Sequence, residues 1–485
     1  MRFLTEVLIS LSLLFCYGTA TDHPRTVELA LMSSVDNTEG IQYFVNLTVG
    51  TPGQLQTVFI DTGSSNTVVF SSNASFNDTP GSVGGTFDST QSSTFEMIRA
   101  GALNLYFGLA TTWFNGDYVK DVIQINDLVI KRIPFGLAYR LRASFTPYTG
   151  ILGLGYSGKM SYKKKHQEAS PPNFVEGLVQ AGAISSRLYS IYLNTLDQYG
   201  SILFGGLDTD KYEGQLTTLN FLHPHGKAKI NNFLLYLEEV KVKPYNESYR
   251  TILRSTTGNR PYTLPDTGVA DWQLPNSAYR EVVRYAGGQP SMGLWPGVGY
   301  EDIVRPCCEV ARGIANTAHF EITFSGNGSN TANLRVDLAD LFSPIATKDG
   351  SAATDSSSRP MCWLRVREVP GGTTFYTSSS VMRAGYWVFD LDNGQVSLAQ
   401  AKLGAISSKV VQVDAGPDGL HKAVKDHLRG KIQKDKVEGQ MSVSVTYELS
   451  TATNTVGYAT GAEYSPTPTG TGIYDPSGDY SPPRS

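Results

Sequence analysis

An aspartate-threonine-glycine tripeptide occurs twice in this 485-residue chain, at residues 61–63 and again at residues 266–268. Each copy follows an apolar run typical of a buried strand, and about two hundred residues separate the two copies. One such tripeptide is weak evidence, because short motifs recur by chance. Two copies in the same strand-like context predict two lobes that each supply one carboxylate to a shared site.

Paired carboxylates can hydrolyse a peptide bond without a covalent intermediate. Two carboxylates within about 3 Å of each other cannot both ionise, so the pair holds one proton. The ionised partner can take a proton from a water molecule while the protonated partner donates to the peptide carbonyl. Glycine permits a sharp turn beside each carboxylate, and the threonine hydroxyl can bond to the other loop. We therefore expect a catalytic pair, Asp61 and Asp266, supported by Thr62, Gly63, Thr267 and Gly268.

The composition is compatible with two large lobes of mainly β structure. Glycine, serine, threonine, tyrosine and valine are abundant, and only 17% of the residues are charged. The net charge is −4 and no basic face stands out, which argues against a nucleic-acid partner.

His223 and His225 have no third metal ligand at a useful spacing, and neither a nucleophilic serine elbow nor a phosphate-binding loop is present. We therefore expect neither a metal nor another cofactor.

The N-terminal residues have the features of an export signal. Arg2 precedes an apolar run at residues 7–17, and small residues at 18–20 precede a plausible cleavage site at Thr21. About eleven apolar residues are too few to span a bilayer, so we expect a secreted, extracellular protein without a membrane anchor; an uncleaved anchor is the alternative. Five glycosylation sequons fit such a protein, at Asn46, Asn73, Asn77, Asn246 and Asn327.

The cysteine count predicts one disulfide. Cys16 is removed with the signal, which leaves Cys307, Cys308 and Cys362 in the mature chain. A bond from Cys362 to either Cys307 or Cys308 would contribute about 4 kcal/mol on the chain-entropy model. The third thiol is expected to be buried and inert, because it neighbours a bonded cysteine; a disulfide to another molecule is the alternative.

Five segments of the chain resemble, in family order, the pepsin-like aspartic proteases, and most closely their fungal secreted members. These segments are residues 50–54, 61–66, 150–156, 201–214 and 386–401, and the resemblance extends over about residues 42–402. Its implied fold is bilobal, with an active-site cleft between two β lobes and a hairpin flap over the cleft. The implied substrate is an extended polypeptide. Between two of these segments, residues 171–181 predict a short helix.

The loops around the two aspartates differ from each other. By resemblance, Ser64 supports Asp61 with a hydroxyl, whereas Val269 and Ala270 stand where most relatives carry hydroxyl residues beside the second aspartate. Losing a hydrogen bond to the charged form should raise the apparent pKa of the pair and move the working pH toward neutral. Two further departures are Pro265, which removes a backbone N–H, and Ser378, where relatives usually have glycine.

The flap also departs from the usual pattern. By resemblance, Tyr106 is the tyrosine placed over the dyad, but Val68 occupies the position of the tryptophan that holds this tyrosine in many relatives. Trp113, within the flap itself, can supply the missing N–H; a core or cleft-lining role without that bond is the alternative.

The chain divides into five parts. We expect a signal peptide at 1–20, a short N-terminal or pro segment at 21–41, a first lobe at 42–210, a second lobe at 211–404, and a low-complexity, disordered tail at 405–485 in which 419–438 also fits a charged helix. About twenty residues separate Thr21 from the first strand, so we expect no zymogen in which a lysine of a long prosegment covers the dyad.

These features predict a secreted, monomeric aspartic endopeptidase that hydrolyses polypeptides at acidic to near-neutral pH. The alternative is a catalytically inactive pepsin-like protein that binds or inhibits, supported by the changes around Asp266. Geometry discriminates between them, because activity requires the two carboxylates within about 3 Å of each other with room for a water molecule.

Overall fold

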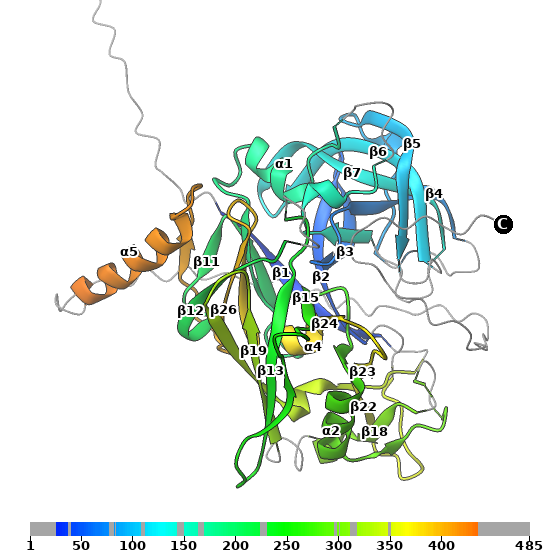
Figure 1. Ribbon diagram of the computed structural model, residues 1–485. Coiled ribbons are helices and arrows are strands. Elements are labelled where there is room, and N and C mark those ends of the chain that lie inside the picture. The colour runs from blue at the N-terminus through cyan, green and yellow to red at the C-terminus, as the bar shows by residue number, and fades with distance from the viewer. Residues whose placement is uncertain are drawn as a thin grey trace, which may run out of the picture.

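The computed structural model describes residues 26–36, 40–76, 82, 84–107, 112–142, 150–162, 169–223, 230–294, 298–299, 301–310, 318–347 and 351–434. The expected signal peptide, the sequon at Asn77, His225 and the chain beyond residue 434 lie outside the described residues. Strands predominate, and two β-rich halves lie on either side of a seam, the first half in blue and cyan and the second in green and yellow (Figure 1). The mainly β fold class is therefore confirmed.

One thirteen-stranded sheet runs through the first half and across the seam. Its spatial order is β12 (Tyr212–Asn220), β26 (Gln395–Ala401), β25 (Gly385–Asp390), β9 (Leu188–Tyr192), β10 (Gly200–Phe204), β1 (Val27–Asp36), β2 (Gly40–Val49), β3 (Gln54–Asp61), β8 (Gly150–Gly153), β4 (Thr67–Phe76), β7 (Leu128–Arg142), β6 (Thr112–Ile125) and β5 (Glu96–Phe107).

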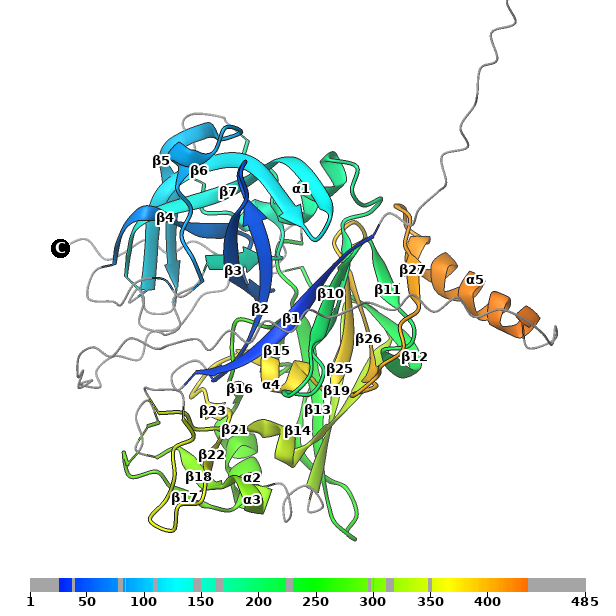
Figure 2. The ribbon, with the colours of Figure 1, turned by 180° about the vertical axis from the view of Figure 1, so that it is seen from behind.

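Strand β1 joins the two parts of this sheet. Its residues 27–31 pair with β10, and its residues 32–36 pair with β2. Figure 2 shows β1 running diagonally between the two halves. The sequence had assigned residues 21–41 to a segment preceding the lobes, whereas the structure places 27–36 inside the sheet. Alternating side chains explain this position, because Val27, Leu29 and Leu31 are buried.

The second half is built around a six-stranded sheet. Its strands are β20 (Thr331–Asp337), β19 (Ala318–Ser325), β13 (Leu235–Pro244), β15 (Tyr262–Asp266) and β24 (Thr374–Ser378), with β14 (Arg250–Arg254) beside β13. Smaller sheets join β16 (Trp272–Leu274) to β23 (Val366–Glu368), β11 (Gly206–Asp208) to β27 (Val410–Gln412), and, in order, β17 (Gln289–Pro290), β18 (Ile303–Pro306), β22 (Met361–Leu364) and β21 (Phe342–Pro344).

Short helices connect the strands. Among the described residues these are α1 (Phe174–Gln180), α2 (Asn276–Ala286), α3 (Cys307–Glu309), α4 (Ser379–Met382) and the 3-10 turns η1 (Ser89–Gln91), η2 (Ser157–Lys159) and η5 (Leu338–Leu341), and a longer helix, α5 (Gly419–Lys434), follows the last strand. Helix α1 was expected over 171–181 but begins later, because Asn173 and Glu176 form a capping box at its start. Gly182 follows its end with a φ of 70°.

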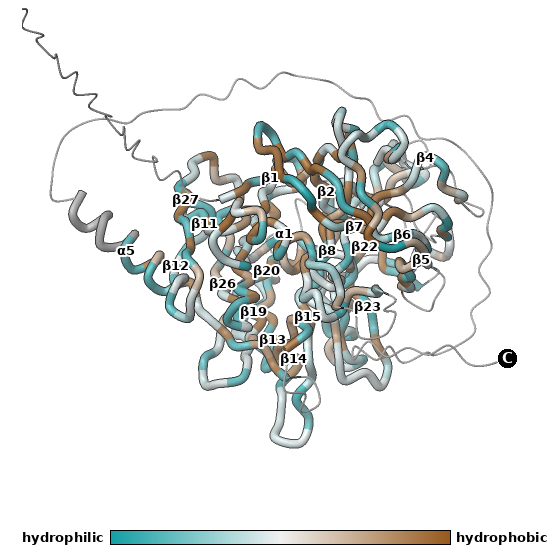
Figure 3. Tube along the Cα trace, turned by 90° about the horizontal axis from the view of Figure 1, so that it is seen from above, coloured by the Kyte–Doolittle hydropathy of each residue, from teal (hydrophilic) through white to brown (hydrophobic). Residues whose placement is uncertain are grey.

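The first part of the predicted tail has regular structure. Strand β27 pairs with β11, and α5 follows and projects from the body of the protein (Figures 1 and 2). Val413 and Leu420 are buried in a cluster with Leu207 and Tyr386, which accounts for the attachment of this segment. Polar and apolar residues are interspersed in the coloured part of α5 (Figure 3). No helix among the described residues is both long and apolar enough to cross a bilayer.

Candidate active site

The two aspartates end equivalent strands. Asp61 is the last residue of β3, whose parallel neighbour β8 places Gly153 opposite it. Asp266 is the last residue of β15, whose parallel neighbour β24 places Ser378 opposite it. The repeated tripeptide therefore occupies two turns of the same kind, one from each half of the molecule.

Four buried hydrogen bonds join the two turns. The Thr62 hydroxyl donates to the carbonyl oxygen of Pro265 at 2.8 Å, and the Thr62 N–H donates to the Thr267 hydroxyl at 3.1 Å. Reciprocally, the Thr267 hydroxyl donates to the carbonyl oxygen of Ile60 at 2.8 Å, and the Thr267 N–H donates to the Thr62 hydroxyl at 3.0 Å. Each hydroxyl thus bridges the loops as both donor and acceptor, which fixes the aspartates relative to each other.

These bonds bring the two carboxyl groups into contact. Asp61 is 6% exposed and Asp266 is 5% exposed, and the two carboxyl groups lie close enough for each to shift the pKa of the other. A Cβ atom at Gly63 would lie 2.1 Å from Oδ2 of Asp266, and one at Gly268 would lie 2.8 Å from Oδ1 of Asp61. Only glycine permits this close approach at both positions.

The hydrogen bonds to the two carboxylates are unequal. Asp61 accepts bonds from the N–H of Gly63 at 2.8 Å, the N–H of Ser64 at 3.2 Å and the Ser64 hydroxyl. Asp266 accepts a bond from the N–H of Gly268 at 2.8 Å, and Val269 has no hydroxyl to add another. The asymmetry expected from Ser64 and Val269 is therefore present in the geometry.

The asymmetry is accompanied by unequal shifts of the two carboxyl pKa values. Burial raises the pKa of Asp61, but the Ser64 hydroxyl and the Gly63 N–H act against that rise. Burial, followed by the neighbouring charge of Asp61, raises the pKa of Asp266 well above its usual range. The pKa of each carboxyl group is thus raised, and that of Asp266, which accepts fewer hydrogen bonds, is raised further.

The unusual residues of the second loop are accommodated. The carbonyl of Pro265 accepts a hydrogen bond from Thr62, and none of the four bonds between the two turns needs an N–H at Pro265. Ser378 is fully buried, and its hydroxyl has no hydrogen-bond partner among the described residues. Helix α4 supports the loop, because the Ser379 N–H donates to the Val269 carbonyl at 2.8 Å and the Ser380 hydroxyl donates to the Ala270 carbonyl at 3.0 Å.

The predicted flap is the hairpin formed by β5 and β6. Tyr106 and Trp113 are directly opposite each other in this hairpin, and Tyr106 is 54% exposed. No hydrogen bond joins their side chains in the described structure, so the bond suggested for Trp113 is not formed here. Tyr118, which sequence reasoning missed, instead donates from β6 to Oδ1 of Asn66 in the buried continuation of the first loop. Val68 is completely buried beside these residues.

The structure places the remaining predicted residues as follows. Cys307 and Cys362 form a disulfide, which resolves the two pairings that the sequence left open. Cys308 is exposed, so the expectation of a buried third thiol was wrong. The cause is its position on the first turn of α3, where adjacent side chains point in different directions.

The described sequon asparagines are all exposed, namely Asn46, Asn73, Asn246 and Asn327.

Sequence reasoning also missed an ion pair beside the second loop. Asp271 lies five residues after Asp266 and pairs with Arg365 and Arg367, each at 2.8 Å. Arg365 is almost completely buried, whereas Arg367 is largely exposed. Because the arginines lie about a hundred residues further along the chain, no local signal links them to Asp271.

Comparison with known proteins agrees with this geometry. The family model for eukaryotic aspartyl proteases matches residues 42–401. Probable aspartic-type endopeptidase opsB of Aspergillus fumigatus is 28% identical over 414 residues, covering 82% of this chain and 76% of the relative. Aspartic proteinase yapsin-3 of Saccharomyces cerevisiae is 29% identical, covering 75% and 66%, and an acid protease of Saccharomycopsis fibuligera is 27% identical, covering 74% and 81%. The match spans most of the chain and includes both aspartate turns, and this protein therefore belongs to the eukaryotic aspartyl protease family.

Proposed function

We propose that this protein is a secreted endopeptidase that hydrolyses polypeptides with a water molecule activated between Asp61 and Asp266. The observation that carries the proposal is the contact between the two buried carboxyl groups, held by reciprocal bonds of Thr62 and Thr267. Ionised Asp61 accepts a proton from the water as it attacks the peptide carbonyl. Protonated Asp266 donates to the carbonyl oxygen, which gives a tetrahedral gem-diol. Asp61 then passes its proton to the amide nitrogen, the C–N bond breaks, and Asp266 takes a proton back from a diol hydroxyl as the carboxylic acid forms.

Secretion is the second part of the proposal. It rests on the apolar segment at 7–17 followed by small residues, on the disulfide between Cys307 and Cys362, and on the exposure of the described sequons. Expression of the full chain in a eukaryotic host tests it. Recovery of a glycosylated protein from the medium, beginning near residue 21, is the expected result.

Digestion of an unfolded protein substrate tests the activity. Purified protein is incubated with substrate between about pH 3 and pH 7, with and without pepstatin. Cleavage that pepstatin abolishes is expected. The alternative function, binding without catalysis, is favoured by the second loop, where Val269 supplies no hydroxyl to Asp266. A folded sample that cleaves at no pH would establish that alternative instead.

The Val269→Thr variant should lower the pH of the basic limb of the activity profile by about one unit. Threonine has the shape of valine and adds a hydroxyl that can donate to Asp266. Such a bond favours the charged carboxylate and so lowers the raised pKa of Asp266, which must remain protonated for catalysis. The measurement is kcat/KM as a function of pH.

Val269→Ala is the matched control for this prediction. It changes packing at the same position without supplying a hydroxyl, so its basic limb should coincide with that of the unmodified protein. Equal shifts in both variants would show that packing, rather than the missing hydrogen bond, sets the upper pH limit.

A further inference from the structure

A small cavity adjoins the first aspartate loop. Its lining includes Thr62, Gly63 and Ser65 of this loop together with Tyr156, Asn231 and Leu264. The space open to the centre of a water molecule is about 10 Å³, which is about the room that one water needs. The cavity therefore lies between the loop that carries Asp61 and residues that lead into the second half of the protein.

Three buried polar atoms in this lining have no hydrogen-bond partner among the described residues. They are the Ser65 hydroxyl, the Tyr156 hydroxyl and Oδ1 of Asn231. Ser65 is 1% exposed, and a Cβ atom at Gly155, another lining residue, would lie 2.9 Å from its hydroxyl oxygen. Buried polar atoms in native proteins are almost always satisfied, by protein or by bound water. Three residues that line one water-sized cavity thus each carry an unsatisfied polar atom.

We propose that one integral water molecule binds in this cavity and joins Ser65, Tyr156 and Asn231. The chemistry of the three atoms fits, because the two hydroxyl groups can donate to the water and the water can donate to Oδ1 of Asn231. Three hydrogen bonds are the usual number for a buried water. Burial raises the pKa of Tyr156, so its hydroxyl remains a donor throughout the working pH range.

The position of this water gives it a role in the proposed catalysis, on which the inference depends. Ser65 directly follows Ser64, whose hydroxyl donates to Asp61. The opposite wall is tied to the same loop, since the N–H of Gly155 donates to the Ser64 carbonyl and the N–H of Leu154 donates to the Asp61 carbonyl, both at 2.8 Å. The water would complete this set of bonds and reach Asn231. Ser65 and Tyr156 are therefore positioning residues for Asp61.

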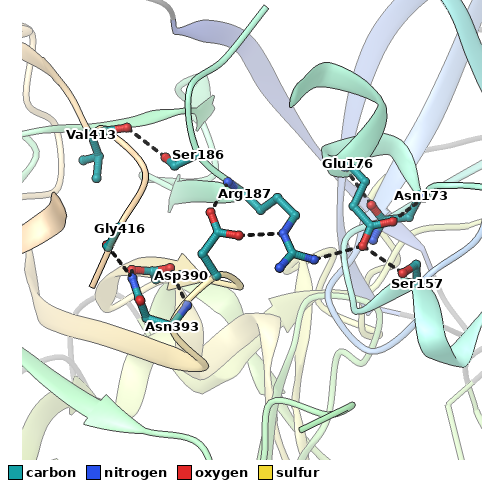
Figure 4. A network of polar contacts seen from close by, with 10 residues as sticks. Ser157, Asn173, Glu176, Ser186, Arg187, Asp390, Asn393, Val413 and Gly416 are labelled. Carbon is teal, nitrogen blue, oxygen red and sulfur yellow. Dashed lines mark hydrogen bonds and ion pairs between the residues drawn. The ribbon is translucent and has the colours of Figure 1, made fainter. Parts of the chain in front are cut away.

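A network of polar contacts holds Ser157, the residue after Tyr156 (Figure 4). Ser157 donates to Glu176 at 2.8 Å, and Glu176 pairs with Arg187 at 3.1 Å. Arg187 continues to Asp392, in the turn between β25 and β26, at 2.7 Å. This ion-pair network holds the segment against the shared sheet, so the bound water links the Asp61 loop to an already anchored support.

The Tyr156→Phe variant removes one partner of the water and leaves the ring packed 5.4 Å from the ring of Phe233. We expect kcat to fall about tenfold with little change in KM, because a loosened loop positions Asp61 less well. The acidic limb of the pH profile should also move to higher pH by about half a unit. A weaker bond from Ser64 stabilises the charged form of Asp61 less, and so raises the pKa of Asp61. The other titratable groups described near Asp61 are Asp266 and the buried Tyr189, whose pKa is raised.

Tyr43→Phe is the matched control. The Tyr43 hydroxyl is also buried without a partner among the described residues, but Tyr43 does not line this cavity. Its kcat and acidic limb should remain unchanged. If the two variants have the same pH profile, the proposed role in positioning Asp61 is wrong.

A crystal structure at high resolution tests the site independently of activity. Ordered density within hydrogen-bonding distance of Ser65, Tyr156 and Asn231 would support the water, and its loss in Tyr156→Phe would confirm the role of the hydroxyl. A cavity that is dry, or that binds xenon as an apolar cavity does, would overturn the inference. Because this measurement needs no substrate, failure of the water site and failure of the proposed protease activity can be told apart.

Discussion

Replacing Asp266 with asparagine is expected to lower kcat for peptide hydrolysis by about 10²–10⁴-fold. Asparagine keeps the shape of the side chain and its bond from the Gly268 N–H, but it cannot deliver a proton to the carbonyl oxygen. Asp61→Asn should have an effect of the same order, because the amide cannot accept a proton from the water. The measurement is initial cleavage rate on an unfolded protein, across the pH range in which the unmodified protein is active.

Asp208→Asn provides the control for burying an amide in place of a carboxyl group. Asp208 is 2% exposed, comparable with Asp266, but it binds Ser408 and Lys409 near β27 instead of the dyad. The Asp208→Asn variant should still cleave the substrate at every pH at which it is folded. Undiminished, pepstatin-sensitive cleavage by Asp266→Asn would refute the two-aspartate mechanism, provided that thermal unfolding shows both variants to be folded.

The features of the site that could be predicted from sequence are encoded locally. The two tripeptides follow strand-like runs, so their place at strand ends and the contact between their turns could be inferred. The contrast between Ser64 and Val269 could also be recognised by position, because each residue lies within three positions of its aspartate. The cysteine count limited the disulfide to two pairings, but Cys307 and Cys308 are adjacent, so the sequence could not decide which of them bonds to Cys362.

What escaped prediction depends on contacts between distant segments. Strand β1 was not recognised as part of the sheet, because its partners β2 and β10 include residues about 170 positions away. Likewise, the composition after residue 405 predicted disorder, yet Val413 and Leu420 suffice to attach that segment to the body. The bond from Tyr118 to Asn66 and the pairing of Arg365 with Asp271 also join residues that are far apart in the sequence. Such pairs become visible only when the chain is folded.

The Asp271→Asn variant should lower the free energy of unfolding by about 3–5 kcal/mol, because it removes the carboxylate that pairs with the buried guanidinium of Arg365. The side chain of Arg365 is 1% exposed and stacks 3.9 Å from the ring of Trp363. It also packs against β2, where a Cβ atom at Gly40 would lie 2.4 Å from the guanidinium. The cation therefore cannot turn to solvent without disturbing the contact between the two halves.

Arg367 makes a controlled comparison possible within the same cluster. It pairs with the other oxygen of Asp271 at the same 2.8 Å, but its side chain is 56% exposed. Arg367→Gln should therefore cost less than about 1 kcal/mol, as exposed ion pairs usually do. Denaturation by urea measures all three proteins. Equal losses in Asp271→Asn and Arg367→Gln would contradict the dependence on burial.

The double variant Asp271→Asn with Arg365→Met separates the ion pair from the shape of the side chain. Methionine fills a similar volume and needs no charged partner, so it should recover most of the stability lost in Asp271→Asn alone. Recovery would show that the loss arises from an uncompensated buried charge. If the double variant is less stable than Asp271→Asn, the guanidinium stabilises the protein mainly through its other contacts, with Trp363 and Gly40. In either case, cleavage by the folded variants measures how closely the Asp266 loop depends on this support.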